Sequence, residues 1–159
     1  IVSARLPEPI RQKCTDLLNF SLPHLKALVQ EPIWGGEPLP LAPCVGDLWY
    51  AHVLFKASQV TGIIDFGSSR IDSVVTDLAR LLGSWNVRGA EEVGKALDIY
   101  SSFRPLTHVE RAAFMGFDRT SRVLSALQWI EWLAVEQRSF ADWDAVSARL
   151  DFVLARLPI

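Results

Sequence analysis

The sequence predicts a mainly α-helical fold with one small β-hairpin. Half of the 159 residues are hydrophobic and 21% are charged, a balance typical of a globule that buries a core. Apolar residues recur at steps of three and four along most of the chain, which is the period of an amphipathic helix. Only residues 51–65 contain short runs of β-branched and aromatic residues. The length favours a single domain over residues 1–159.

The first predicted helical segment covers residues 9–30, where apolar residues keep a helical spacing on both sides of Pro23. Because proline lacks an N–H and clashes with the preceding turn, we expect either two short helices or one helix kinked at Pro23. Residues 31–43 contain four prolines as well as Gly35 and Gly36. That composition predicts a long ordered loop.

The hairpin is the only β-structure that the sequence predicts. Its strands are expected at residues 51–55 and 60–65, joined by a turn at residues 56–59. A helix over residues 74–82 follows, with Asp72 or Ser73 as its cap.

Three further helical segments are predicted after it. Residues 90–102 form the first of these. Thr107 and Glu110 have the spacing of a capping box, so a long helix or a pair of helices is expected to follow them. Asp142 is expected to open the last helix.

Charge and cysteine content exclude several classes of protein. The formal net charge is −2 with Lys and Arg scattered, which excludes the basic surface of a nucleic-acid-binding protein. Cys14 and Cys44 lack the spacing of a zinc site and are too few for a disulfide framework, so we expect a cytoplasmic protein. Residues 123–135 are the most apolar stretch, but they are too short to cross a bilayer. We therefore expect neither nucleic acid nor membrane as a partner.

Three residues with functional side chains lie in or beside the predicted hairpin. Asp47 follows the proline-rich loop, His52 stands at the start of the first strand, and Asp65 ends the second strand. We expect the hairpin to bring all three to one end. Two carboxylates there, one able to accept a proton and one able to hold a metal ion, suit phosphoryl transfer, which depends on positioning and charge neutralisation.

Around these residues the sequence resembles the aminoglycoside phosphotransferase and choline kinase family of the protein-kinase-like superfamily. The family's catalytic loop has the pattern His-Gly-Asp-x-x-x-x-Asn, matched here by residues 46–47 and the apolar residues 53–55. Its metal loop, a hydrophobic pair before Asp-Phe-Gly, is matched by residues 63–67. A polar segment, residues 70–72, then leads to Asp-Leu-Ala-Arg-Leu-Leu at residues 77–82.

The resemblance implies the C-terminal, helical lobe of a kinase-like fold. It also implies ATP-dependent transfer of the γ-phosphoryl group to a hydroxyl group of a small molecule, with Mg²⁺ as cofactor. In this family pattern Asp47 would orient or deprotonate the acceptor hydroxyl, Asp65 would bind magnesium, and Asp77 would brace the catalytic loop.

Two positions depart from the family pattern. Val45 stands where the family usually has His, and His52 stands where it has a metal-binding Asn. Magnesium favours oxygen ligands over an imidazole nitrogen. His52 is therefore predicted either as a metal ligand, together with Asp65, or as a structural hydrogen-bonding residue.

The sequence ahead of Asp47 contains no glycine-rich nucleotide loop and no strand lysine, which a kinase-like fold places before its catalytic loop. The chain also begins at Ile1 and has Met115 as its only methionine. We therefore expect the C-terminal lobe of a longer protein, whose N-terminal nucleotide lobe is missing here. Nucleotide and a small-molecule acceptor are the expected partners, and the chain alone is expected to be inactive.

Other interpretations remain open for the same residues. Asp47 and Asp65 can be simple turn residues. Val45 and His52 also fit a kinase-like binding or regulatory protein that has lost catalysis. An unrelated helical interaction domain with a chance motif is a third alternative.

Two further features are interpreted as packing. Cys44 lies near Asp47 without an identifiable base, so we predict a small buried hydrophobe. Trp129 and Trp132 flank Glu131, and we favour core packing over a wall that binds a cationic or sugar-like acceptor.

Overall fold

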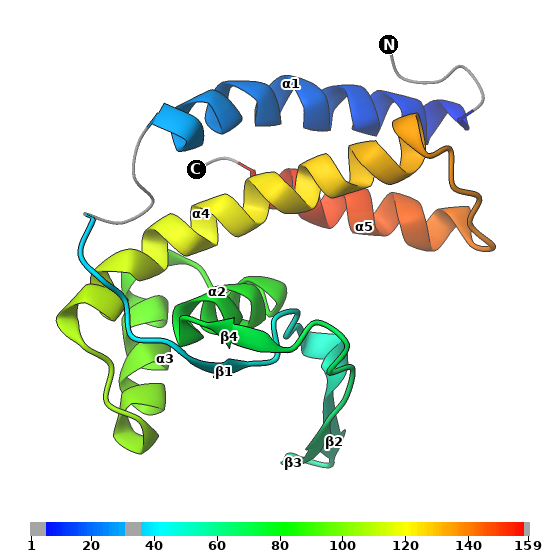
Figure 1. The fold of residues 1–159 in the computed structure, drawn as a ribbon. Helices are drawn as coiled ribbons and strands as arrows, with labels where there is room; N and C mark the ends of the chain where they lie inside the picture. Colours follow the sequence, from blue (N-terminus) through cyan, green and yellow to red (C-terminus); the bar gives the residue numbers. More distant parts are fainter. Residues whose placement is uncertain (1–5, 31–35, 158–159) are drawn as a thin grey trace. The chain divides into compact units, whose positions relative to one another are not determined.

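The structure is a computed structural model that describes residues 6–30 and 36–157. Helices dominate it, and the strands form two separate two-stranded sheets (Figure 1). The elements in chain order are α1 (Glu8–Gln30), β1 (Ala42–Cys44), the 3-10 turn η1 (Tyr50–His52), β2 (Val53–Lys56), β3 (Gln59–Ile63), β4 (Arg70–Asp72), α2 (Val74–Ser84), α3 (Gly89–Phe103), α4 (His108–Ile130), the π-helical turn η2 (Glu131–Val135) and α5 (Trp143–Arg156). The prediction of a mainly helical fold with a small hairpin is confirmed.

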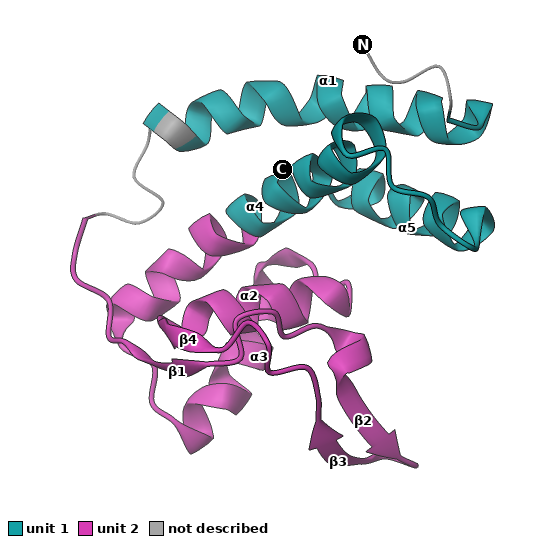
Figure 2. Cartoon of the chain, turned by 45° about the vertical axis from the view of Figure 1, so that its right-hand side comes forward, with its two compact units in different colours: residues 1–32, 119–159 teal, residues 33–118 magenta. Residues whose placement is uncertain are grey.

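The chain divides into two compact units, coloured separately in Figure 2. Unit 1 comprises residues 1–32 and 119–159, and unit 2 comprises residues 33–118. Helix α4 contributes its first part to unit 2 and the rest to unit 1. That residues 1–159 form a single domain stays a prediction. No helix among the described residues is long and apolar enough to span a membrane.

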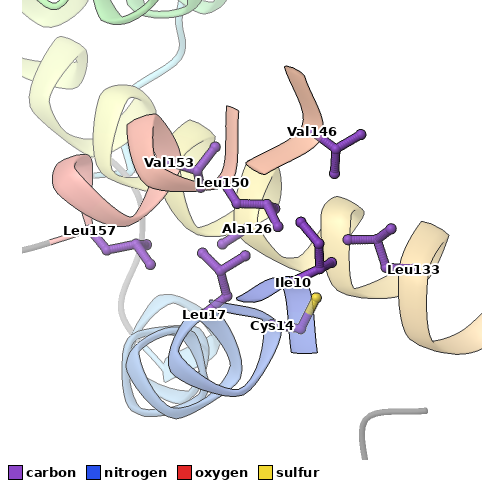
Figure 3. Packing of buried hydrophobic residues seen from close by; sticks show 9 residues of the cluster. All are labelled: Ile10, Cys14, Leu17, Ala126, Leu133, Val146, Leu150, Val153 and Leu157. Carbon is purple, nitrogen blue, oxygen red and sulfur yellow. The ribbon is translucent and has the colours of Figure 1, made fainter. Parts of the chain in front are cut away.

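Unit 1 has an apolar core between helices. Ile10, Cys14 and Leu17 are spaced four and three residues apart on α1, so they lie on one face of that helix, and all three are buried. They pack against buried residues from the C-terminal part of the chain (Figure 3), which are Ala126, Leu133, Val146, Leu150, Val153 and Leu157. Lys13 Nζ also joins α1 to α5 through Asp151 Oδ2 at 2.7 Å. The predicted segment 9–30 is a single helix that contains Pro23.

The helix starts follow signals in the local sequence. Ser73 caps α2, because its side chain accepts a hydrogen bond from the backbone N–H two residues later. Asp142 caps α5 by accepting from the N–H three residues later. Thr107 and Glu110 form the predicted capping box, in which Glu110 N donates to Thr107 Oγ1 and Thr107 N donates to Glu110 Oε2. These three predictions are confirmed.

Unit 2 has its own core, formed mainly by one face of α2. The apolar residues on that face are all buried. They join Leu97 of α3 and Phe114 of α4 in one cluster, whose α2 members are Val75, Leu78, Ala79 and Leu82. The polar face of α2 is consequently left for other contacts.

Both sheets belong to unit 2. β2 and β3 form the predicted hairpin, in which Val53 lies opposite Ile63. The predicted strand bounds are wrong at two ends, because residues 51 and 52 belong to η1 and β3 ends at Ile63, before Asp65. β1 pairs antiparallel with β4, with Cys44 opposite Arg70. The prediction that the hairpin is the only β-structure is therefore wrong. The prediction of a loop that continues to Pro43 is also wrong, because β1 begins at Ala42. A strand of three residues depends on a distant partner, and an edge position tolerates proline. Residues 31–35 of the predicted loop lie outside the described residues.

Candidate active site

The loop before Asp47 is held by Asp77 of α2. Asp77 Oδ2 accepts a hydrogen bond from Val45 N at 2.7 Å, and Oδ1 accepts one from Gly46 N at 2.9 Å. One carboxylate thus satisfies two consecutive backbone N–H groups with charge-assisted hydrogen bonds, which are stronger than neutral ones. This contact is the bracing that the resemblance implies for Asp77.

Gly46 lies where two loops approach each other closely. Its φ is +85°, and a Cβ at this position would lie 2.1 Å from Ser68 O. Arg70 strengthens the same contact, because its Nη1 donates to Gly46 O at 3.2 Å while its Nε binds Asp72 Oδ2 at 2.8 Å. The segment that follows Asp65 is therefore packed directly against the loop that contains Asp47.

The Asp47 side chain forms an ion pair with α2. Arg80 Nε lies 2.8 Å from Asp47 Oδ1. The Asp47 side chain is nevertheless 42% exposed, so its carboxylate remains accessible to a small molecule.

His52 connects the two acidic residues. Its Nδ1 lies 2.9 Å from Asp47 O, and its Nε2 lies 3.5 Å from Asp65 Oδ2. Trp49 Nε1 also donates to His52 Nε2 at 2.6 Å. An indole N–H can only donate, so in the neutral ring Nε2 is the acceptor and the proton is on Nδ1, from which it is donated to Asp47 O.

Asp65 follows the end of β3. Its φ is 63°, in the left-handed region that Asp tolerates better than most residues other than glycine. Its side chain is 61% exposed, whereas the His52 side chain beside it is only 13% exposed. The structure therefore brings Asp47, His52 and Asp65 together, with the imidazole in contact with both acidic residues.

The two predicted metal ligands differ in how well they fit Mg²⁺. Magnesium binds oxygen and is typically held by one or two carboxylates together with water and substrate phosphates. The exposed Asp65 carboxylate fits this donor set, but both ring nitrogens of His52 already have partners within the chain. Within residues 6–30 and 36–157, no three His, Cys, Asp or Glu side chains gather closely enough to hold a metal ion by themselves. The arrangement favours the hydrogen-bonding role for His52.

Cys44 is buried at the end of β1, as predicted. Burial raises the pKa of its thiol, and the nearby carboxylates of Asp77 and Asp72 raise the pKa further. A thiol in this environment stays protonated at neutral pH, which supports the interpretation as a small hydrophobe.

The tryptophans near the end of α4 belong to unit 1. The Trp129 and Trp132 rings are 5.2 Å apart in an edge-to-face arrangement, and Trp129 packs against the apolar core. The Arg138 guanidinium lies 4.8 Å from the centre of the Trp132 ring. Core packing thus accounts for Trp129. Trp132 is half-buried, and the Arg138 guanidinium covers its ring.

Sequence reasoning missed three residues that shape the site. Arg80 binds Asp47, Trp49 binds His52, and Ser84 Oγ accepts a hydrogen bond from Tyr50 N at 2.8 Å. Arg80 and Ser84 could have been found from their spacing after Asp77, because positions three and seven residues later share its helix face. No local pattern indicates the contact of Trp49.

The comparisons with known proteins agree on one kind of enzyme. The sequence model of a protein family described as the phosphotransferase enzyme family matches residues 4–114 of this chain. Homoserine kinase from Methylobacillus glycogenes is 34% identical over 82 residues, which is 48% of this chain and 26% of that protein. Homoserine kinase from Beijerinckia indica is 27% identical over 139 residues, which is 80% of this chain and 43% of that protein. The chain therefore spans less than half the length of these curated relatives.

Among solved structures, a choline/ethanolamine kinase family protein from Mesorhizobium loti has a similar fold. The TM-score is 0.55 at 19% sequence identity, and the match covers 98% of this chain and 53% of the other. This likeness supports the fold predicted for the chain, a helical lobe of a kinase-like protein. Because the family model covers most of the sequence, the alternative of a chance motif is excluded and the chain belongs to the phosphotransferase enzyme family.

Proposed function

We propose that the chain carries the catalytic and metal-binding loops of an ATP-dependent kinase that phosphorylates a hydroxyl group of a small molecule. The observation that supports this most strongly is the arrangement around His52, which contacts both Asp47 O and Asp65 Oδ2. Phosphoryl transfer needs an acidic residue for the acceptor and another for the metal, held in a fixed relation to each other.

In the proposed reaction, the acceptor hydroxyl oxygen bonds to the γ-phosphorus of ATP. The bond from that phosphorus to the β–γ bridging oxygen breaks, and ADP leaves with the electron pair. Asp47 orients the hydroxyl and takes its proton, a role that suits an accessible carboxylate on a braced loop.

Asp65 would hold Mg²⁺, which supplies positive charge against the phosphates when it is bound. His52, in the proton arrangement described above, fixes the Asp47 backbone through its Nδ1 and fills its Nε2 with Trp49, without itself binding the metal.

Homoserine is the acceptor that we propose to test first, because the curated relatives compared above are homoserine kinases. Choline, aminoglycosides and sugars offer hydroxyl groups of the same chemical kind and serve as the comparison panel.

We further propose that turnover requires a nucleotide-binding lobe that this chain does not encode, within a longer protein called here the full-length protein. Its support is the lack of a glycine-rich loop before Asp47 and the fact that the chain spans only 26% and 43% of the two relatives. The isolated chain should then give no product from ATP, Mg²⁺ and homoserine. A cytoplasmic location is part of the same proposal.

One observation favours a second function, that of a kinase-like binding protein without turnover. His52 replaces the family's metal-binding Asn, and its ring nitrogens are already used within the chain. The metal site would then have one oxygen ligand fewer than in the family pattern.

Turnover of the full-length protein separates the two functions. With ATP, Mg²⁺ and homoserine we expect ADP and O-phosphohomoserine in equal amounts, measured by coupled ADP release and phosphorus NMR. ATP binding by calorimetry without product from any acceptor of the panel would favour the binding protein. The His52→Asn variant adds a second criterion: a gain in magnesium-dependent turnover would indicate a weakened metal site, whereas a loss would indicate that His52 has its own role in holding Asp47.

A further inference from the structure

One face of α2 carries three polar side chains that contact the segment around Asp47. Asp77, Arg80 and Ser84 are three and four residues apart, so they share a face of the helix. Asp77 binds the N–H groups that precede Asp47, and Ser84 binds the N–H of Tyr50. Arg80 differs from both, because it binds the side chain of the acidic residue.

Asp47 is consequently held at two points. His52 binds its backbone carbonyl at 2.9 Å, and Arg80 Nε binds carboxylate Oδ1 at 2.8 Å. The backbone contact fixes the position of Asp47, but rotation of a carboxylate about χ2 has only a broad, shallow preference. The Arg80 contact is the one that determines which way the carboxylate oxygens point.

We infer that Arg80 is a positioning residue for Asp47, which sets the orientation of the carboxylate that receives the acceptor proton. This inference rests on the function proposed above. A guanidinium suits the task because it is charged at every working pH and presents its N–H groups in a rigid plane. The opposite, apolar face of α2 is part of the core of unit 2, so the helix is itself firmly anchored.

The test compares Arg80→Gln with Arg88→Gln in the full-length protein, using ATP, Mg²⁺ and homoserine. Arg88 is an exposed arginine of the same unit, and its Nε contacts Asn86 only two residues away. Displacement of a reacting group by about 1 Å can lower the rate ~100-fold. We therefore expect kcat of Arg80→Gln to fall roughly 10- to 100-fold. KM for homoserine and for ATP should stay within about twofold of wild type, because ground-state binding is untouched. Arg88→Gln should match wild type in both parameters.

A double-mutant cycle distinguishes positioning from direct contact with substrate. If Arg80 acts only through Asp47, then adding Arg80→Gln to Asp47→Asn should cause no further loss of turnover. Multiplied losses, or a raised KM for ATP, would mean that Arg80 binds phosphate itself, and would overturn the inference. Arg80→Lys keeps the charge without the planar fork and should give an intermediate kcat.

Two controls keep the outcomes separate. Circular dichroism and thermal unfolding of each Arg80 variant should match wild type, so that a loss of kcat is not a loss of fold. An active wild type whose kcat is unchanged by Arg80→Gln overturns this inference alone. A wild type that phosphorylates no acceptor of the panel overturns the proposed function and this inference with it.

Discussion

Unit 1 and the Asp47 loop of unit 2 are held in place by different kinds of contact. In unit 1, buried apolar side chains such as Leu17 and Leu150 lie between helices and are fully shielded from water. In unit 2, the Asp47 loop is fixed by directional polar contacts from Asp77 and Arg80. Apolar burial supplies free energy with little directionality, whereas hydrogen bonds fix geometry with little net free energy. Substitutions in unit 1 should therefore change stability, and substitutions at the loop should change activity.

The largest expected effect is on turnover. Asp47→Asn in the full-length protein removes the proton acceptor and should lower kcat by ~10²–10⁴-fold, the usual contribution of a general base. The free energy of unfolding should change little, because the ion pair with Arg80 is partly exposed. Asp98→Asn is the control, since this exposed carboxylate pairs with Arg111 at 2.8 Å. Equal activity of Asp47→Asn and Asp98→Asn would place the base elsewhere.

The next effect concerns stability alone. Leu150→Ala leaves a cavity in the core of unit 1 and should lower the free energy of unfolding by about 2–5 kcal/mol in a urea titration. Leu124→Ala on α4 is the matched control, because Leu124 is 54% exposed and its truncation should cost less than about 0.5 kcal/mol. A kcat per folded molecule that fell with Leu150→Ala would show that the proposed separation of stability from activity is wrong.

Gly46→Ala should change both quantities, because backbone geometry and loop packing meet at this residue. The added Cβ would lie 2.1 Å from Ser68 O at a φ of +85°, and a strained residue of this kind costs about 1–3 kcal/mol. We expect a lower unfolding midpoint together with a lower kcat. Gly94→Ala in α3 has open space around its Cβ and should stabilise the protein by roughly 0.5–1 kcal/mol. Identical midpoints for the two variants would contradict the close approach at Gly46.

The smallest effect appears only at high pH. Burial raises the pKa of the Cys14 thiol from 9.0 to about 11. The unfolded chain therefore releases this proton more readily than the folded chain, and the stabilisation is complete below pH 9 and is lost as pH rises towards 11. By pH 10 the loss should be about 1.4 kcal/mol.

A comparison with Cys14→Ala isolates this contribution, because the raised pKa values of Cys44 and Tyr100 are present in both proteins. Unfolding midpoints between pH 8 and pH 11 should fall more steeply for wild type than for Cys14→Ala. Parallel curves would show that Cys14 ionises equally in both states.

Features with local signals were predictable from the sequence, and those formed by distant partners were not. The caps at Ser73 and Asp142, for example, depend on residues two and three positions away. β1 is only three residues long and exists because it pairs with β4, so no pattern within residues 42–44 indicates it.

The same distinction applies to the candidate site. The meeting of Asp47, His52 and Asp65 followed from the expected hairpin, and the resemblance supplied the role of Asp77. The partner of the Asp47 carboxylate, Arg80, was missed, although it lies three residues after Asp77 and so on the helix face that the brace already turns towards the loop.

The pairing of β1 with β4 also has a consequence for folding. Because Cys44 lies opposite Arg70, residues 45–69 form a closed loop whose two ends meet, and Asp47, His52 and Asp65 all lie within it. Closing that loop costs conformational entropy, and the contacts inside the loop offset this cost together. Opening of the two short strands should therefore release Asp47, His52 and Asp65 in one cooperative event. Amide hydrogens in residues 44–46 and 70–72 that depend on this opening should exchange with deuterium at a common opening free energy.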